Sequence, residues 1–263
     1  MFELTNKVAV VTGASSGIGY EAAIAYAKAG ADMAVLARRK DKLDDLASKI
    51  NSLGSRAIAI QCDISKEEDV KKSIELILNN FKTIDILLNN AGIAVRGSVD
   101  TLTEEAWDLS MNTNLKGAFL MCKYVIPHMK NKRYGKIINI ASENAFFADK
   151  ADIAARHSYN TSKAGVIGLT TGMAATYAKY GITVNSICPG LFESEMTAPI
   201  MSKIENFEEN YNAMCPMSRL CNKDASYGTI LYFSSDASSY VTGQNIFVDG
   251  GISIIWKGCC TSS

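Results

Sequence analysis

Seven short apolar runs recur along the chain, and a stretch with helical spacing follows most of them. Continuous apolar runs of this length suit strands that are buried on both faces, as in a parallel sheet. Strands that alternate with helices of about 10–15 residues predict βαβ units with right-handed crossovers and a ligand site at the carboxyl ends of the strands. The sequence therefore predicts an α/β fold, with a doubly wound parallel sheet of about seven strands and helices on both faces.

The expected strands cover residues 7–12, 32–37, 56–61, 84–88, 136–141, 182–188 and 245–248. The expected helices cover residues 17–29, 41–53, 67–81, 114–130, 159–179 and 224–234. No linker, repeat or low-complexity segment interrupts them, and a length of 263 residues is within reach of one α/β domain. We therefore predict a single domain over residues 1–263.

Composition excludes several classes of protein. The 27 Lys and Arg residues balance the 27 Asp and Glu residues, which leaves no electrostatic footprint for nucleic acid or an anionic membrane. No apolar run approaches the roughly 20 residues of a membrane-spanning helix, and the first run ends at Gly13, too early for the core of a signal peptide. We expect a cytoplasmic protein without nucleic-acid or membrane partners.

The cysteines indicate neither a disulfide framework nor a metal site. Seven cysteines form no CxxC pair, and the two histidines, His128 and His157, are far apart in the sequence. This spacing favours reduced thiols that are mostly buried. The vicinal Cys259 and Cys260 are interpreted as incidental rather than redox-active.

The first strand ends in a glycine-rich turn that opens the first helix. Gly13 lets the chain turn at positive φ, Gly17 lets the backbone approach a pyrophosphate, and Gly19 lets the helix pack close to the sheet. The helix N-terminus offers N–H groups and a positive dipole to phosphates. The spacing GxxxGxG differs from the GxGxxG fingerprint, so the prediction of a nucleotide site depends on the strand before the turn and the helix after it. We predict a dinucleotide site formed by Gly13, Ser15, Ser16, Gly17, Ile18 and Gly19.

The end of the second strand indicates which nicotinamide cofactor is used. An acidic residue there would hold the ribose hydroxyls, whereas this chain has Arg38 and Arg39, whose planar charged forks suit a 2′-phosphate. We predict NADP(H); the alternative is NAD(H), with the two arginines as solvated charges at the head of a charged helix. Asp63, followed by Ile64, is a candidate acceptor for the adenine amino group, or else a helix cap.

Tyr159 and Lys163 form a YxxxK pair whose members share one face of a predicted helix. A phenol with a pKa of about 10 is a poor acid or base at neutral pH, and a neighbouring ammonium lowers that pKa. The pair is therefore a candidate general acid/base. Ser142 follows a buried strand, where its hydroxyl could bind a reacting carbonyl or cap a loop. Asn114 begins a predicted helix, where N-capping is the simpler role.

These motifs occur together in one order. The chain carries TGASSGIG at residues 12–19, NNAG at 89–92, Asn114, Ser142, YNTSK at 159–163 and Pro189-Gly190. In this combination it resembles a short-chain dehydrogenase/reductase from Lys7 to Gly251. The resemblance implies a single Rossmann-type domain, with a cofactor half at about residues 1–135 and a catalytic and substrate half at about 136–263.

The resemblance implies a role for each candidate catalytic side chain. Tyr159 would exchange a proton with the substrate oxygen, and Ser142 would position that oxygen. Lys163 would bind the nicotinamide ribose and lower the pKa of Tyr159. Asn114 would hold a water molecule that links Lys163 to solvent.

The resemblance also implies further positions along the cofactor. The NNAG segment would border the adenosine ribose and the edge of the sheet, and the Pro-Gly pair would flank the nicotinamide. Ser194 stands where the family usually has a threonine that binds the carboxamide, and Phe192 replaces a more usual aliphatic residue. The positions are Asn90, Ala91, Gly92, Pro189, Gly190, Phe192 and Ser194.

The constellation predicts an enzyme that transfers a hydride between NADP(H) and a secondary alcohol or ketone, without a metal ion. A catalytically silent nucleotide-binding regulator is the alternative from another class, and a broken tetrad would favour it; here all four residues are present. An epimerase or dehydratase on a related fold is a third reading, although such chains are usually longer.

Two segments suggest the size of the substrate. Residues 144–157 form a loop that brings Phe146 and Phe147 to the pocket, unless both pack under the loop as core. The segment 192–216 and its immediate continuation add four adaptable methionines, Met196, Met201, Met214 and Met217. We expect a bulky, mostly apolar substrate, such as a hydroxysteroid or bile acid. The alternatives are a 3-oxoacyl thioester and a sugar or polyol.

The helix at 159–179 also suggests an assembly. It is rich in glycine and alanine, which permits close approach of helices. The family usually pairs this helix and the one near 114–130 across two-fold axes. We predict a homotetramer, with a dimer as the alternative.

Overall fold

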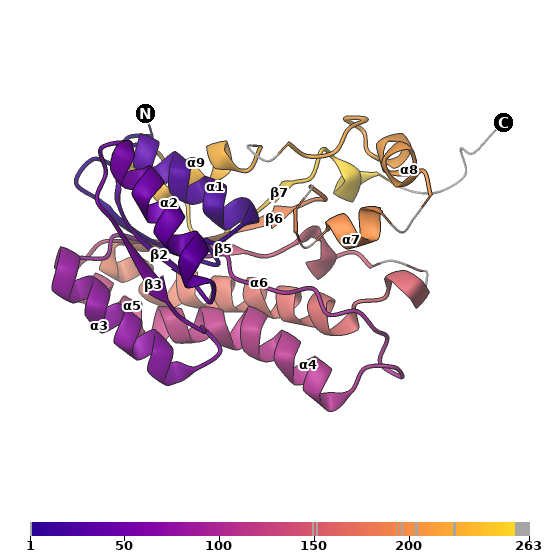
Figure 1. Ribbon diagram of the computed structural model, residues 1–263, viewed down its shortest axis with the longest axis horizontal. Helices are drawn as coiled ribbons and strands as arrows, with labels where there is room; N and C mark the ends of the chain where they lie inside the picture. The colour runs from indigo at the N-terminus through magenta and orange to yellow at the C-terminus, as the bar shows by residue number, and fades with distance from the viewer. Residues whose placement is uncertain are drawn as a thin grey trace.

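One sheet of seven parallel strands lies at the centre of the protein (Figure 1). The computed structural model describes residues 2–148, 150, 152–192, 194–195, 197–202, 205–222 and 225–255. The strand order is β3-β2-β1-β4-β5-β6-β7, a Rossmann-like arrangement that confirms the predicted fold class. The strands are β1 (Val8–Thr12), β2 (Asp32–Ala37), β3 (Ala57–Gln61), β4 (Ile86–Asn89), β5 (Gly135–Ile140), β6 (Ile182–Pro189) and β7 (Asn245–Val248).

Helices cover both faces of this sheet (Figure 1). Side chains alternate along each strand, so that Val11 faces one apolar core and Val10 the other. The first core is covered by α1 (Gly17–Lys28), α2 (Lys40–Ser52) and α9 (Tyr227–Ser234), and the second by α3 (Glu67–Phe81), α5 (Gly117–Lys132) and α6 (His157–Tyr177). Because both faces are covered, the strands are mostly apolar, as the sequence predicts, with buried polar side chains such as Asn139 and Asn185 among them.

The helix predicted at 114–130 is longer than expected. It begins as α4 (Glu104–Met111), continues through a π-helical segment (Asn112–Lys116) and ends as α5. The Thr103 hydroxyl accepts a hydrogen bond from the Ala106 N–H at 3.2 Å and caps the start. Asn114 therefore lies inside a helix, and the N-cap role considered for it is wrong.

The segment after β6 contains more helix than expected. Two short helices, α7 (Ala198–Met201) and α8 (Phe207–Met214), lie in this methionine-containing segment, where the sequence analysis expects no helix. Among the helices of the described residues, none is both long and apolar enough to span a bilayer. Four cysteines are buried, as predicted: Cys62, Cys122, Cys188 and Cys215. Cys259 and Cys260 lie outside the described residues.

A buried carboxylate fixes the amino-terminal edge of the sheet. Asp85 directly precedes β4 and has no exposed surface. Its side chain accepts a hydrogen bond from the Val8 N–H at 2.9 Å and forms an ion pair with the ammonium of Lys132, at the end of α5. One side chain therefore holds β1, β4 and α5 together.

The variant Asp85→Ala tests this role. Removal of the carboxylate leaves the buried Val8 N–H without a hydrogen-bond acceptor, and an unsatisfied buried donor costs free energy. We expect the free energy of unfolding to fall by about 2–3 kcal/mol. The control Asp45→Ala removes an exposed carboxylate of α2 and changes stability by less than about 0.5 kcal/mol. Urea unfolding curves measure both, and equal losses in the two variants would contradict the assignment.

Candidate active site

The glycine turn is locked against the end of β4. Gly13 has a φ of +67°, as predicted, and a Cβ atom there would lie 2.7 Å from the Ala91 Cα. The side-chain amide of Asn90 donates to the carbonyl of Thr12 at 2.9 Å and lies where a Cβ of Gly19 would come within 2.4 Å. Asn90 and Ala91 thus lie against the turn because only glycine leaves room for them.

The surroundings of this turn fit a dinucleotide. The first turn of α1 holds no acidic side chain, so no residue of that turn competes with an anion for its N-terminal N–H groups. A hollow of about 430 Å³ lies beside Gly17, lined among others by Ser15, Ser16 and Ile18. A second hollow, of about 470 Å³, includes Arg38 and Asp63 in its lining. The described lining of both hollows excludes the four candidate catalytic side chains, so both lie apart from the reacting centre; together with the glycine turn, we call them the groove.

The two arginines after β2 point to different parts of this groove. Arg39 donates to the hydroxyl of Ser15 at 3.0 Å and to that of Ser16 at 2.9 Å, so it lies over the glycine turn. Arg38 lines the hollow that holds Asp63. The sequence treats them as one pair, but the structure places Arg39 over the glycine turn and Arg38 beside the end of β3.

Asp63 is not the cap of α3, because Lys66 occupies that position. Its carboxylate accepts hydrogen bonds from the amide and hydroxyl of Ser65, at 3.1 and 2.7 Å. Burial alone would raise the pKa of Asp63, but these bonds and the nearby Lys66 and Arg38 outweigh it and lower the pKa. Ile64 is buried and packs against Gly117 of α5, where a Cβ would lie 2.5 Å from its Cδ1. Asp63 is thus a half-buried, ionised acceptor, whereas the side chain of Ile64 belongs to the core.

The four candidate catalytic side chains converge beyond the carboxyl ends of β4 and β5. The Ser142 hydroxyl lies close enough to Tyr159 to lower its pKa. The Nζ atom of Lys163 lies 5.7 Å from the centre of the Tyr159 ring. A Cβ atom on Gly92 would lie 3.4 Å from that Nζ and 3.2 Å from the Oδ1 atom of Asn114. Three distant stretches of sequence therefore meet at Gly92.

Burial opposes charge on both members of the YxxxK pair. Lys163 is 4% exposed, and burial lowers its pKa to about 8. Its ammonium donates to the Ile140 carbonyl at 2.7 Å. Burial raises the pKa of Tyr159, and the nearby Ser142 hydroxyl only partly offsets this. The protein groups alone thus leave the pKa of Tyr159 raised, which corrects the lowered value that the sequence predicts.

Asn114 is a bridge between three elements. Its amide accepts from the Ile93 N–H at 2.8 Å, donates to the Ile93 carbonyl at 2.9 Å and donates to the Ser162 hydroxyl at 2.9 Å. Ser162 in turn donates to the Tyr159 carbonyl at 2.8 Å. Sequence reasoning missed Ser162, although its place inside YxxxK, one residue before Lys163, was a usable signal. Together these bonds tie the chain after β4 to α6.

The loop after β6 closes the opposite side of the groove. A Cβ atom on Gly190 would lie 2.8 Å from the Asp249 Cα, so Pro189-Gly190 packs tightly against the end of β7. Ser194 faces Gly17 across the groove, and its N–H donates to the Thr197 hydroxyl at 2.9 Å. Sequence reasoning missed Thr197 as the partner of Ser194. Glu193 and Met196 lie outside the described residues.

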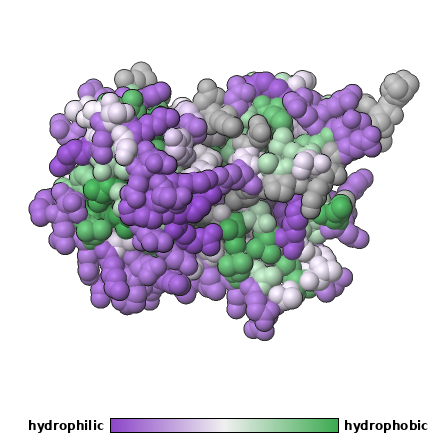
Figure 2. Space-filling view, in the orientation of Figure 1, coloured by the Kyte–Doolittle hydropathy of each residue, from purple (hydrophilic) through white to green (hydrophobic). Residues whose placement is uncertain are grey.

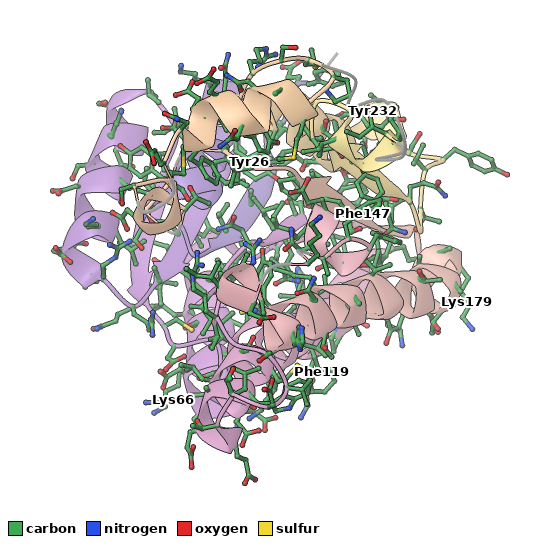
Figure 3. The ribbon with its side chains drawn as sticks, turned by 90° about the vertical axis from the view of Figure 1, so that its right-hand side faces the viewer. Tyr26, Lys66, Phe119, Phe147, Lys179 and Tyr232 are labelled. Carbon is green, nitrogen blue, oxygen red and sulfur yellow. The ribbon has the colours of Figure 1, made fainter. Side chains whose placement is uncertain are left out.

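The loop expected to border the substrate is both aromatic and acidic. Phe146 and Phe147 are 54% and 47% exposed and pack against Phe247, with ring centres 5.1 and 6.4 Å away. Figure 3 shows Phe147 above α6 and Phe119 below it. The carboxylate of Glu143, which the sequence analysis did not consider, lies close enough to Tyr159 to help raise its pKa. The lining is therefore less uniformly apolar than predicted.

A family profile described as short chain dehydrogenase matches residues 7–205. The chain belongs to the short-chain dehydrogenase/reductase family. As a member it is an oxidoreductase that acts on CH–OH groups with NAD(P). The family profile ends before β7, but the relatives described next extend the likeness over nearly the whole chain.

Relatives in this family differ in substrate. The chain is 36% identical to the 3-oxoacyl-[acyl-carrier-protein] reductase FabG of Staphylococcus epidermidis, over 94% of this chain and 99% of the relative. It is also 36% identical to the NAD-dependent glycerol dehydrogenase of Listeria innocua, over 96% of each. A gluconate 5-dehydrogenase from Burkholderia cenocepacia, solved with NADP and tartrate, has a TM-score of 0.91 at 33% identity and covers 97% of this chain and 98% of its own. The hydroxysteroid or bile acid expected from the sequence finds no support in these names.

The lowered pKa of Lys163 predicts a pH dependence of stability. The folded value of about 8 lies below the unfolded value of about 10.4. Between these values the unfolded chain binds more protons, so stability rises with pH. We expect the wild type to gain about 2–3 kcal/mol over Lys163→Met between pH 7.5 and 10 in urea unfolding. Lys28→Met, at the end of α1, gives no such difference, and parallel curves for wild type and Lys163→Met would refute the buried ammonium.

Proposed function

We propose that the chain is an NADP(H)-dependent reductase of 3-oxoacyl thioesters. The observation that carries this proposal is the convergence of Tyr159 with the buried Lys163, whose Nζ lies 5.7 Å from the Tyr159 ring centre, beside the nearby Ser142 hydroxyl. Support for the thioester comes from the aromatic cluster of Phe146, Phe147 and Phe247, which offers an exposed apolar surface to an acyl chain. The 36% identity to a 3-oxoacyl reductase supports the same choice.

Each catalytic residue then has a role set by its contacts. The Ser142 Oγ accepts from the Asn144 N–H at 3.1 Å, which fixes the hydroxyl that positions the substrate oxygen. Tyr159 donates its proton to that oxygen during reduction. Lys163 and Asn114 adjoin Gly92, where they hold the ribose side of the site and the route of proton supply. The bound cofactor supplies the hydride.

The preference for NADP(H) is supported by Arg39. Its guanidinium lies over the Ser15 and Ser16 hydroxyls, where a cation and two hydroxyls can face one phosphate. The end of β2 carries no carboxylate that could hold the ribose hydroxyls, since Arg38 and Arg39 follow Ala37. A relative solved with NADP supports the same cofactor.

A sugar or polyol is the second candidate substrate. Glu143 favours it, because a carboxylate beside Tyr159 could accept hydrogen bonds from additional hydroxyls. The glycerol and gluconate dehydrogenases among the relatives favour it as well.

A substrate panel tests the function. We expect kcat/KM with NADPH to be at least about tenfold higher for acetoacetyl-coenzyme A than for dihydroxyacetone, 5-ketogluconate or a ketosteroid. NADPH absorbance measures each reaction. Tyr159→Phe is the control and should lower kcat/KM by roughly 10²–10⁴ while cofactor affinity stays within a few-fold. A preference for dihydroxyacetone or 5-ketogluconate would transfer the assignment to the second candidate, and full activity in the Phe variant would overturn both.

We also propose a homotetramer. Large apolar side chains of α4 and α5 are exposed, among them Trp107, Leu109 and Phe119. Figure 2 shows apolar side chains gathering over the lower half of the face where α4 and α6 run. Such a patch marks an interface more often than free surface. The dimer is the alternative.

Phe119→Asp tests the assembly. A carboxylate in an apolar interface is costly, so we expect light scattering to give a smaller species than in the wild type. Tyr240→Asp, at a fully exposed side chain away from these helices, should leave the mass unchanged. A wild type that scatters as a stable 28.4 kDa monomer would rule out the tetramer and the dimer.

A further inference from the structure

An exposed carboxylate from the loop after β6 lies on the cationic side of the groove. One oxygen of Glu195 lies 2.8 Å from the Nη1 atom of Arg39, and the other lies 2.8 Å from the Nζ atom of Lys42. Arg39 is the N-cap residue of α2, and Lys42 lies in the first turn of that helix. A residue more than 150 positions later in the chain thus bridges two cations at the end of β2.

The place of this carboxylate is where an anion is best held. Arg39 also donates to Ser15 and Ser16, so the guanidinium, the Lys42 ammonium and two hydroxyls gather around one point beside the glycine turn. A carboxylate in an arginine fork uses the same N–H groups as a phosphate. The two cations hold the pKa of Glu195 at about 2, so it stays ionised at neutral pH.

We propose that Glu195 is a specificity-determining residue that competes with the 2′-phosphate of NADP(H) for Arg39 and Lys42. This inference rests on the proposed use of NADP(H). The same N–H groups cannot serve both anions in full, so the 2′-phosphate takes them only as Glu195 withdraws. NAD(H) carries no phosphate at this position and leaves the bridge intact. Glu195 therefore weakens the binding of NADP(H) but not that of NAD(H), and so reduces the preference for NADP(H) over NAD(H).

The exchange also reaches the loop after β6. Glu195 lies next to Ser194, which faces Gly17 across the hollow that Phe192 also lines. Withdrawal of the carboxylate frees one end of this segment from α2.

Direct binding measures the competition without turnover. Isothermal titration calorimetry gives the Kd of NADP⁺ and NAD⁺ for the wild type and for Glu195→Gln. Both ion pairs are exposed and so modest in energy, and we expect NADP⁺ to bind roughly three- to tenfold more tightly to the variant, with NAD⁺ unchanged. Adenosine 2′,5′-bisphosphate should show the same gain and adenosine 5′-monophosphate none. The control Glu205→Gln removes an exposed carboxylate of the same region and should change nothing.

The variant Arg39→Gln distinguishes a failure of the proposed competition from a failure of the NADP(H) assignment. If this variant weakens NADP⁺ and Glu195→Gln leaves the affinity unchanged or lower, the competition is refuted and the NADP(H) assignment stands. Equal gains for NADP⁺ and NAD⁺ in Glu195→Gln would likewise refute it. If Arg39→Gln leaves NADP⁺ binding unaltered, the cofactor assignment itself is wrong.

Discussion

The hydrogen bonds between Thr12 and Asn90 hold the two halves of the site in register. Thr12 ends β1, and Asn90 follows β4, its neighbour in the sheet. The Thr12 hydroxyl accepts from the Asn90 and Ala91 N–H groups at 3.0 and 3.1 Å, and the side-chain amide of Asn90 donates to the Thr12 carbonyl. Strand order reverses at this point, which is where an open α/β sheet leaves a crevice. The glycine turn on one side and the Gly92 neighbourhood on the other take their positions from this contact.

The reacting centre is a place where burial works against ionisation. Lys163 is pushed towards its neutral form and Tyr159 away from its phenolate. A proton donor for reduction benefits from the second effect, because Tyr159 keeps its proton until an oxygen with developing charge approaches. Ser142 is the protein group whose hydroxyl works against that burial, which places the tuning of Tyr159 in the loop after β5 rather than in the YxxxK helix alone.

Much of the fold could be predicted because the strands are short, apolar and separated by recognisable helices. The helix α4 was harder to predict. Thr103, Glu104 and Glu105 are typical of a helix start, but the π-helical segment at Asn114 interrupts the α-helical spacing that would join α4 to α5. Motif residues such as Tyr159 were predictable because chemistry fixes their type and spacing. Glu195 and Thr197 were not, because their importance comes from partners in distant or irregular segments that no local pattern reveals.

The π-helical segment sets a count of residues that the chain must keep. The Gly117 N–H bonds to the Asn112 carbonyl, five residues earlier, so α4 and α5 form one rod whose two parts are out of phase by about one residue, or roughly 100° of rotation. Deleting one residue from Asn112–Lys116 would restore a continuous α-helix. It would also swing the outward face of α4, with Trp107 and Leu109, around the axis relative to α5 and carry Asn114 away from Ser162. The number of residues in this segment therefore fixes two things at once: which face of α4 is turned outward and where Asn114 lies in the site. A change in its length would alter both.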